Sequence, residues 1–463
     1  MFLLFFCLKK AYLCGQVMMN WQQLISNKRL GQEHRHPERH DDRTEFKRDY
    51  DRLIFSAPFR RLQNKTQVFP LPGSIFVHNR LTHSLEVASV GMSLGNDVAT
   101  QLTAKHPELK EGLFQEIGQI VATACLAHDL GNPPFGHSGE KVIQSFFTEG
   151  AGYDLQRQVS PIFWNDMIHF EGNANAFRLL THQFKGRRPG GFVMTYSTLA
   201  SIVKYPYSSS ATSKKGKFGF FDSEKAYYRR IADELGIPCK SEVGEPLRYA
   251  RHPLVYLVEA ADDICYEIMD IEDAHKLKII SHNETMQLLL AFFDEKTQQR
   301  ILKRIDDEGV NDNNEKVVYL RACVIGKLEN ECVRVFVEHE KDILSGDFQG
   351  SLIDHISELP QRAYKDCCAL SMAHIYKSRP VLDVELSGYQ IIQTLMERFI
   401  NAAVHPERFY SKHLISRVSS QYDIDSPDLE TRIMAIIDYI SGMTDVYALD
   451  VFQKINGISL PII

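Results

Sequence analysis

Apolar residues recur at steps of three and four positions along most of this chain, and this periodicity limits the fold more than any other sequence feature. The clearest stripe runs through residues 257–271, and comparable stripes cover residues 81–102 and 113–125. Longer helical patterns follow at 386–403 and 429–439. No sustained strand alternation, internal repeat, or Rossmann or P-loop glycine pattern accompanies them. The sequence therefore predicts a mostly α fold.

The composition is that of an ordinary globular protein. The 463 residues are 44% hydrophobic and 24% charged, which is enough apolar material for one or two buried cores. The formal net charge of -6 gives no long-range attraction for polyanions. Any binding of nucleotides or nucleic acid must therefore come from local clusters of lysine and arginine.

The first residues are apolar, but their order does not suit a secretion signal. Two lysines follow the apolar run Met1–Cys7, whereas a signal peptide carries its charges before the apolar run. Met18 and Met19 begin a polar stretch, and we hypothesise that residues 1–18 are a disordered extension or the product of a misplaced start codon. No other stretch approaches the roughly 20 apolar residues of a membrane span, so we expect no membrane partner.

The cysteines favour a reducing compartment. Nine of them stand at irregular positions, including the adjacent Cys367 and Cys368, with an odd total and no CxxC repeat. This pattern suits reduced thiols better than a disulfide framework, and it predicts a cytoplasmic protein.

Two segments are predicted to lie in solvent. Residues 27–49 are crowded with arginine, histidine and acids, and we interpret them as a solvated arm that leads into a helix. Between about Tyr205 and Phe221, serines, lysines and glycines give a composition typical of a mobile surface loop.

The strongest local signal is the run AHDLGNPPFGHSGE at residues 127–140. It brings His128, Asp129, His137 and Glu140 together just beyond an apolar helix. Adjacent His and Asp side chains at a helix end can both turn toward one ion, because the last turn need not point them apart. Two more ligands would complete a metal site.

Side chains on two other predicted helices can supply those ligands. His83 begins the helix at 81–102, and Asp262 lies beside the apolar stripe of the helix at 257–271. Imidazole and carboxylate ligands of this kind suit Mn, Mg, Co, Ni or Zn, and they leave positions open for water and phosphate oxygens.

Asp262 also belongs to a polar stripe with Tyr266 and Asp270, at steps of four residues. A solvated helix face would look similar, but the neighbouring acids Glu259 and Asp263 crowd one sign of charge where such a face usually alternates signs. Asp263 competes with Asp262 as the ligand, because spacing alone does not choose between them. The four-residue link to Tyr266 favours Asp262.

The order of His83, His128, Asp129 and Asp262 resembles the signature of the His-Asp (HD) phosphohydrolase superfamily. Five separated motifs narrow this to a resemblance to the bacterial deoxyguanosinetriphosphate triphosphohydrolase family, over about residues 20–455. These motifs lie at residues 59–70, 128–140, 170–174, 259–266 and 439–445.

The resemblance implies a domain organisation and a reaction. Residues 19–275 would form the HD core with its N-terminal arm, and residues 276–463 a C-terminal helical extension that supports oligomerisation and the nucleotide pocket. The family hydrolyses dGTP, in some members also other dNTPs, to the deoxynucleoside and inorganic triphosphate. A divalent cation, with Mn, Mg or Co expected before Ni or Zn, would assist attack by water at the α-phosphate.

The resemblance also implies roles for individual residues. The metal would be held by His83, His128, Asp129 and Asp262, while His137 handles protons and Glu140, one turn on, fixes its tautomer. The expected substrate contacts are Arg80 at the α-phosphate, Lys204 and Lys217 at the outer phosphates, Asn173 in the pocket wall, Gln67, Tyr266 and Asp270 at the deoxyribose, and Glu385 at the base.

Other functions and partners stay open at this point. An HD cyclic-nucleotide or cyclic-dinucleotide phosphodiesterase with two metals would need further histidines, for which His169 and His182 are the candidates beyond His137. A catalytically silent nucleic-acid-binding HD module is the second alternative, although no expected ligand is missing. Family likeness further implies a homo-oligomer, in some members a hexamer, and single-stranded DNA as an effector.

Overall fold

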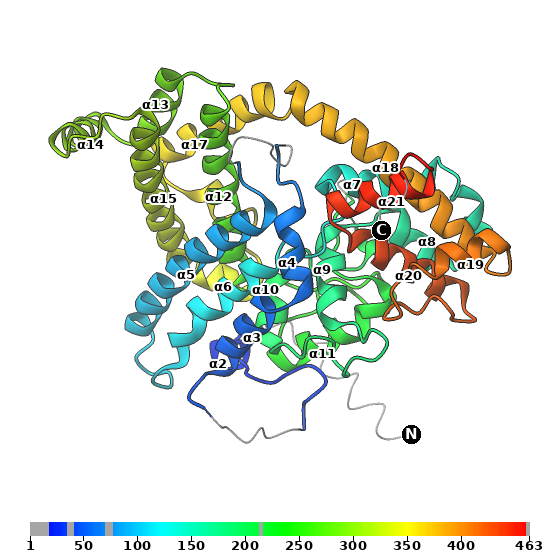
Figure 1. The fold of residues 1–463 in the computed structure, drawn as a ribbon. Helices are drawn as coiled ribbons and strands as arrows, with labels where there is room; N and C mark the ends of the chain where they lie inside the picture. The colour runs from blue at the N-terminus through cyan, green and yellow to red at the C-terminus, as the bar shows by residue number, and fades with distance from the viewer. Residues whose placement is uncertain (1–17, 35–40, 70–76, 213–215, 460–463) are drawn as a thin grey trace, which may run out of the picture.

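A computed structural model describes residues 18–34, 41–69, 77–212 and 216–459 (Figure 1). The extension expected at residues 1–18 therefore lies outside the described residues, except for its last position. Within the described ranges the regular structure is helical, with only isolated β-bridges between single residues. This confirms the predicted mostly α fold. Over the same ranges, no helix is both long enough and apolar enough to cross a membrane.

Three helices form the centre of the molecule and carry the predicted ligands. The stripes at 81–102, 113–125 and 257–271 all lie in helices, and residues 113–116 form a separate 3-10 turn before the second one. The first two central helices pack closely, since a Cβ on Gly95 would lie 2.6 Å from the Cα of Gly118. The helices are α5 (Arg80–Lys105), α6 (Ile117–Ala127) and α12 (Val255–Lys276).

The remaining helices surround this centre in chain order. Before α5 come α2 (Trp21–Leu24), α3 (Glu45–Ile54), α4 (Ala57–Arg61) and η1 (Leu62–Asn64). Between α5 and α12 lie η2 (Leu113–Glu116), α7 (Gly136–Thr148), η3 (Tyr153–Arg157), α8 (Pro161–Ile168), α9 (Gly172–Thr181), α10 (Tyr196–Ile202), η4 (Ser209–Ala211), η5 (Asp222–Glu224) and α11 (Lys225–Leu235).

After α12 the chain continues as helices to the end of the described region. These are α13 (His282–Leu290), α14 (Glu295–Asp307), α15 (Asn313–Glu338), α16 (Glu340–Ser345), η6 (Ile353–His355), α17 (Glu358–Leu370), the π-helical turn η7 (Ser371–Ile375), α18 (Arg379–Val404), α19 (Phe409–Ile415), α20 (Leu429–Ser441) and α21 (Asp445–Ile455).

The helices after α12 pack on two separate hydrophobic cores. α15 packs against α5 and α12, whereas α20 and α21 pack with α18, which lies on α7. α18 joins the two cores, because Val381 near its start belongs to the first and Ile391 to the second. Figure 1 shows α18 arching from the side of α17 toward α19, while α14 projects at the edge of the molecule. The loop between α6 and α7 lies where the two cores meet.

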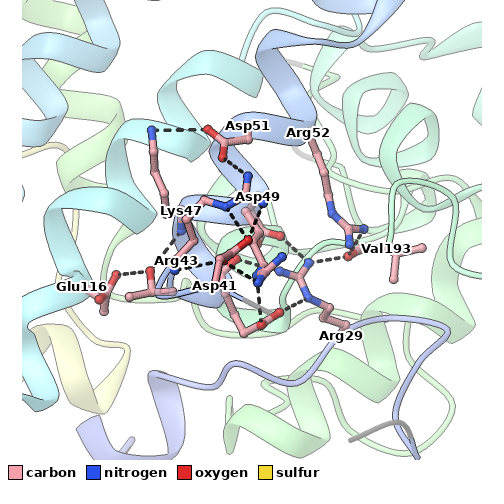
Figure 2. Close-up of polar contacts among 12 residues, drawn as sticks. Arg29, Asp41, Arg43, Lys47, Asp49, Asp51, Arg52, Glu116 and Val193 are labelled. Carbon is pink, nitrogen blue, oxygen red and sulfur yellow. Dashed lines mark hydrogen bonds and ion pairs between the residues drawn. The ribbon is translucent and has the colours of Figure 1, made fainter. Parts of the chain in front are cut away.

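The charged arm is less exposed than its composition predicts. Arg29 is buried and donates hydrogen bonds to Glu45, to Asp49 and to the carbonyl of Val193 (Figure 2). The fully buried Asp49 also accepts from the backbone N–H and the hydroxyl of Thr195, at 2.9 and 2.7 Å. The expected solvated arm is therefore wrong for these positions, because charges of opposite sign can be buried once they are paired. We call Arg29, Glu45, Asp49 and Thr195 the Arg29 cluster.

The segment expected as a surface loop also packs inward in its described parts, 205–212 and 216–221. Phe218, Phe220 and Phe221 are fully buried, and the Ser209 hydroxyl donates to the buried Asp166 at 2.5 Å. The expectation is wrong here because it considered the serines, lysines and glycines of the segment and not its three phenylalanines, whose side chains pack into the hydrophobic cores.

Candidate metal centre and active site

Three of the four predicted ligands lie together where α5, α6 and α12 meet. Potential ligand atoms of His83, His128 and Asp262 are all within 4.8 Å of one another. The Asp262 Oδ1 atom lies 3.1 Å from His83 Nε2 and 3.5 Å from His128 Nε2. His83 sits in the first turn of α5, and His128 is the C-cap of α6. The structure thus groups Asp262, and not its neighbour Asp263, with the two histidines.

The chemistry of this cluster suits a divalent cation. His128 Nδ1 lies 2.6 Å from the carbonyl of Cys125, which can only accept, so Nδ1 carries the proton and Nε2 faces the cluster. Nε2 is buried and has no hydrogen-bond partner. Burial opposes charging of this ring, but Asp129 and Asp262 raise the pKa of His128. A buried imidazole nitrogen facing carboxylates is the donor set of a divalent metal site.

Asp129 lies beside the three-residue group, and hydrogen bonds from two other side chains hold its carboxylate. Its Oδ1 atom lies 3.6 Å from His128 Nε2, and its carboxylate accepts hydrogen bonds from Arg80 and Asn132. Although burial opposes ionisation, the Arg80 guanidinium lowers the pKa of Asp129 to about 2. Arg80 reaches this position because Gly136 has no side chain, and a Cβ there would lie 2.3 Å from Arg80 Nη2. Arg80 therefore holds a predicted ligand here and is itself buried.

His137 and Glu140 line the same pocket but are not bonded to each other. Glu140 is buried, accepts from the backbone N–H of Gly172 at 2.9 Å and pairs with Lys217 at 3.5 Å. The His137 ring lines the pocket. The protein atoms around the ring limit its hydration, and this desolvation, together with the positive charges of Arg80 and Lys217, lowers the pKa of His137. The expected hydrogen bond between His137 and Glu140 is absent, because Glu140 turns inward toward the start of α9.

The two predicted phosphate lysines line this pocket and are held by carboxylates. Lys204 lies 3.2 Å from Glu259, and Lys217 lies 2.5 Å from Glu171. Asn173, also in the pocket wall, donates to Glu171 at 2.9 Å. Sequence reasoning gave no role to Glu171 or Glu259, although both stand in motifs that it singled out.

Two of the predicted deoxyribose residues, Tyr266 and Asp270, contact a tyrosine that sequence reasoning missed. Tyr266 stacks on Tyr376 with ring centroids 6.0 Å apart, and the Tyr376 hydroxyl donates to Asp270 at 2.7 Å. Tyr266 also meets the edge of the His83 ring at 6.5 Å. Gln67 Oε1 is buried without a hydrogen-bond partner. Tyr376 follows η7 directly, more than 100 residues after Tyr266, so no local pattern pointed to it.

Glu385 is a predicted substrate residue outside the set that lines the pocket, as are Gln67, Arg80, Tyr266 and Asp270. It is exposed on α18 and is absent from the residues that line the pocket. One turn later α18 packs closely on the loop between α6 and α7, where a Cβ on Gly388 would lie 2.6 Å from Phe135 Cγ.

The additional histidines of a two-metal site are not assembled among the described residues. The only group of three or more potential ligands there contains neither His169 nor His182. His182 instead lies beside Arg178 and Glu224, in the wall of a separate cavity of about 530 Å³.

Comparison with known proteins agrees with this geometry. Residues 80–169 match the HD domain, and residues 356–454 match the phosphohydrolase-associated domain. Deoxyguanosinetriphosphate triphosphohydrolase-like proteins from Pseudomonas aeruginosa and Synechocystis sp. are each 36% identical, and each alignment covers 96% of this chain and 100% of the relative. The deoxyguanosinetriphosphate triphosphohydrolase of Yersinia enterocolitica is 29% identical, over 89% of this chain and 93% of the relative. The chain belongs to the family of deoxyguanosinetriphosphate triphosphohydrolase-like proteins, which are HD-domain phosphohydrolases.

Proposed function

We propose that this protein hydrolyses dGTP, with weaker or comparable action on other dNTPs, to the deoxynucleoside and inorganic triphosphate. One observation carries the proposal. A single pocket is lined by His128, Asp129 and Asp262 and also by Lys204 and Lys217. Carboxylates and imidazoles that can hold a cation thus share a wall with two lysines that can bind a chain of phosphates. The names of the relatives support the nucleotide part of the proposal.

The reaction requires one water and one proton transfer. The oxygen of water bonds to the α-phosphorus, the bond from phosphorus to O5′ breaks, and O5′ leaves with a proton as the deoxynucleoside hydroxyl. A divalent cation at His83, His128, Asp129 and Asp262 would stabilise charge on the phosphate. The lowered pKa of His137 leaves its ring neutral at neutral pH, so it can take the proton from water and return it to O5′.

The tyrosine pair supports a preference for deoxyribose. Tyr376 stacks on Tyr266 and is itself fixed by its hydrogen bond to Asp270. The Tyr266 ring therefore cannot move aside, and an added 2′-hydroxyl would collide with it. Asp270 and Gln67 remain the groups that can bond the 3′-hydroxyl.

A product analysis in labelled water tests the proposal. The purified protein with Mn²⁺ or Mg²⁺ is incubated with each of the four dNTPs and with GTP in H₂¹⁸O, and products are separated by ion chromatography and mass spectrometry. We expect triphosphate from dGTP, no product from GTP, and the label in triphosphate because water attacks phosphorus. Orthophosphate or pyrophosphate as first product, or label in the deoxynucleoside, would contradict the proposed cleavage position.

A further inference from the structure

Lys65 is a buried lysine whose bonds fasten the loop between the predicted ligand Asp129 and His137. Its side chain is 3% exposed, and its ammonium group donates to the carbonyl of Asn132 at 2.5 Å and to the carbonyl of Ser441 at 3.0 Å. It therefore ties the start of the 129–137 loop to the end of α20, which is more than 300 residues away in sequence.

Asp445 fastens the other end of the same loop. This buried acid begins α21, and its two carboxylate oxygens accept from the backbone N–H of Phe135 at 2.9 Å and of Thr66 at 2.8 Å. Phe135 has a left-handed backbone with φ 62° and is the N-cap of α7, but its side chain cannot cap that helix. Asp445 thus fixes the turn from which His137 projects.

The two tethers bear directly on groups that the mechanism uses. Asn132, whose carbonyl Lys65 holds, donates its side-chain amide to Asp129. The backbone N–H of Arg80 donates to the carbonyl of Lys65 at 3.2 Å, so the residue that pairs with Asp129 is aligned by the same lysine. A displacement of the loop would therefore change the distance between His137 and the metal ligands.

We propose that Lys65 and Asp445 are positioning residues, which hold His137 in register with the His83, His128 and Asp262 cluster by tethering the 129–137 loop to the turn at residues 441–445. The inference rests on the proposed hydrolysis, and it gives the C-terminal region a part in the active site. Neither residue touches substrate. Their effect is on the geometry of proton transfer, where a displacement of about 1 Å can lower the rate about a hundredfold.

Asp445→Asn is the first test, because it keeps the shape of the side chain and leaves only one oxygen for two backbone N–H groups. We expect kcat for triphosphate release from dGTP to fall about a hundredfold. KM and bound Mn²⁺, measured by mass spectrometry of the metal, should stay near the wild-type values, because Asp445 holds the His137 end of the loop while Asp129 keeps its hydrogen bonds from Arg80 and Asn132.

Lys65→Met is the second test and guards against a folding defect in the first. Burial lowers the pKa of Lys65 to about 7, because the ammonium group is poorly solvated. The methionine side chain has a similar length and carries no charge, so the substitution removes this desolvation cost. It also leaves the carbonyls of Asn132 and Ser441 without their donor. This variant should stay folded in thermal unfolding and still lose kcat.

Glu331→Gln is the matched control. Glu331 is also a buried carboxylate that accepts from the backbone N–H at the start of a helix, from Ser357 before α17 at 3.1 Å, but it lies on α15. It should lose stability and keep kcat. An unchanged kcat in Asp445→Asn and Lys65→Met would overturn the proposal, and so would equal losses in Glu331→Gln or a loss of Mn²⁺ in step with kcat.

Hydrogen exchange separates this inference from the proposed function. If the wild-type protein releases no triphosphate, the proposed reaction is wrong, and the tether is then tested by amide exchange of residues 135–137, the part of the loop after Pro133 and Pro134, in the Mn²⁺-loaded protein. Faster exchange in Asp445→Asn than in the wild type supports the tether, because the Phe135 N–H loses its acceptor. Equal rates overturn it.

Discussion

The Arg29 cluster and the His83, His128 and Asp262 cluster are both buried groups of charged side chains, but they differ in how they are satisfied. In the first, each buried side-chain nitrogen and oxygen has a hydrogen-bond partner within the described part of the chain (Figure 2). In and beside the second, His128 Nε2 and Arg80 Nε are buried without one.

This difference separates polar groups that support the fold from groups that serve chemistry. Each unpaired buried polar atom lowers stability by about 1–3 kcal/mol, and a bound cation would satisfy His128 Nε2 at this cluster. The Arg29 cluster joins the N-terminal arm to the start of α10, whose far end leads to Lys204. The Arg29 cluster thus supports a wall of the pocket. The His83, His128 and Asp262 cluster has a buried imidazole nitrogen without a hydrogen-bond partner, and two of its residues line the pocket.

The largest effect is expected from His128→Ala. Because this ring supplies the unpaired nitrogen of the cluster, the variant should lose both bound Mn²⁺ and turnover, with little loss of stability in the metal-free protein. Metal analysis, triphosphate release and urea unfolding in EDTA measure the three quantities. His413→Ala on the exposed face of α19 is the control, and retained Mn²⁺ in His128→Ala would break the comparison.

His137→Ala should leave the metal in place and slow turnover by about 10²–10⁴-fold, the usual contribution of an acid–base group. The pKa of His137 is lowered, so the neutral ring persists below the ordinary value of about 6.5, and the acid limb of the wild-type kcat/KM profile should lie below that pH. The profile is measured at saturating Mn²⁺. An acid limb above that value, or normal turnover of the variant, would contradict the role of His137.

Asp49→Ala tests the other side of the comparison. It removes one of the two buried carboxylates that pair with Arg29 and leaves Glu45 as the other, so the free energy of unfolding should fall by about 3–5 kcal/mol, measured in urea. The matched variant Asp423→Ala breaks an exposed pair with Lys185 and should lose less than about 1 kcal/mol. Equal losses in the two variants would mean that the Arg29 cluster is not a support of the fold.

The last test concerns the pH dependence of stability at His78, which joins the segment before α5 to α12. Burial opposes its charge, but hydrogen bonds to Asp273 and Glu86 raise the pKa of His78 to about 10. Its stabilising contribution is therefore complete below the unfolded value of about 6.5 and is lost as the pH rises toward 10.

Urea unfolding of the wild type and His78→Gln at pH 6, 8 and 10 measures this contribution. The difference in unfolding free energy between the two proteins should shrink as the pH rises, and Mn²⁺ content should not change. A difference that is constant or grows with pH would show that His78 is not held as a cation.

The central helices could be predicted because their signals are local, whereas the grouping of Asp262 with the two histidines was predicted from the resemblance to the HD superfamily. Apolar spacing marks α12, and adjacent His128 and Asp129 mark a helix end. The partners of these residues were beyond reach, because Tyr376 meets Asp270 across 106 residues and Asp445 meets Thr66 across 379. The burial of Arg29 was missed for the same reason, since a run of charges does not show which of them will pair.

The bond between Asp445 and the backbone of Thr66 also dictates when the pocket can be completed during synthesis. Thr66 is added to the chain 379 residues before its acceptor Asp445, and this interval takes about 20–75 s at 5–20 residues per second. The three central helices can form in that interval, but the turn that aims His137 cannot. The contact that fixes this turn therefore forms only after the start of α21 has emerged.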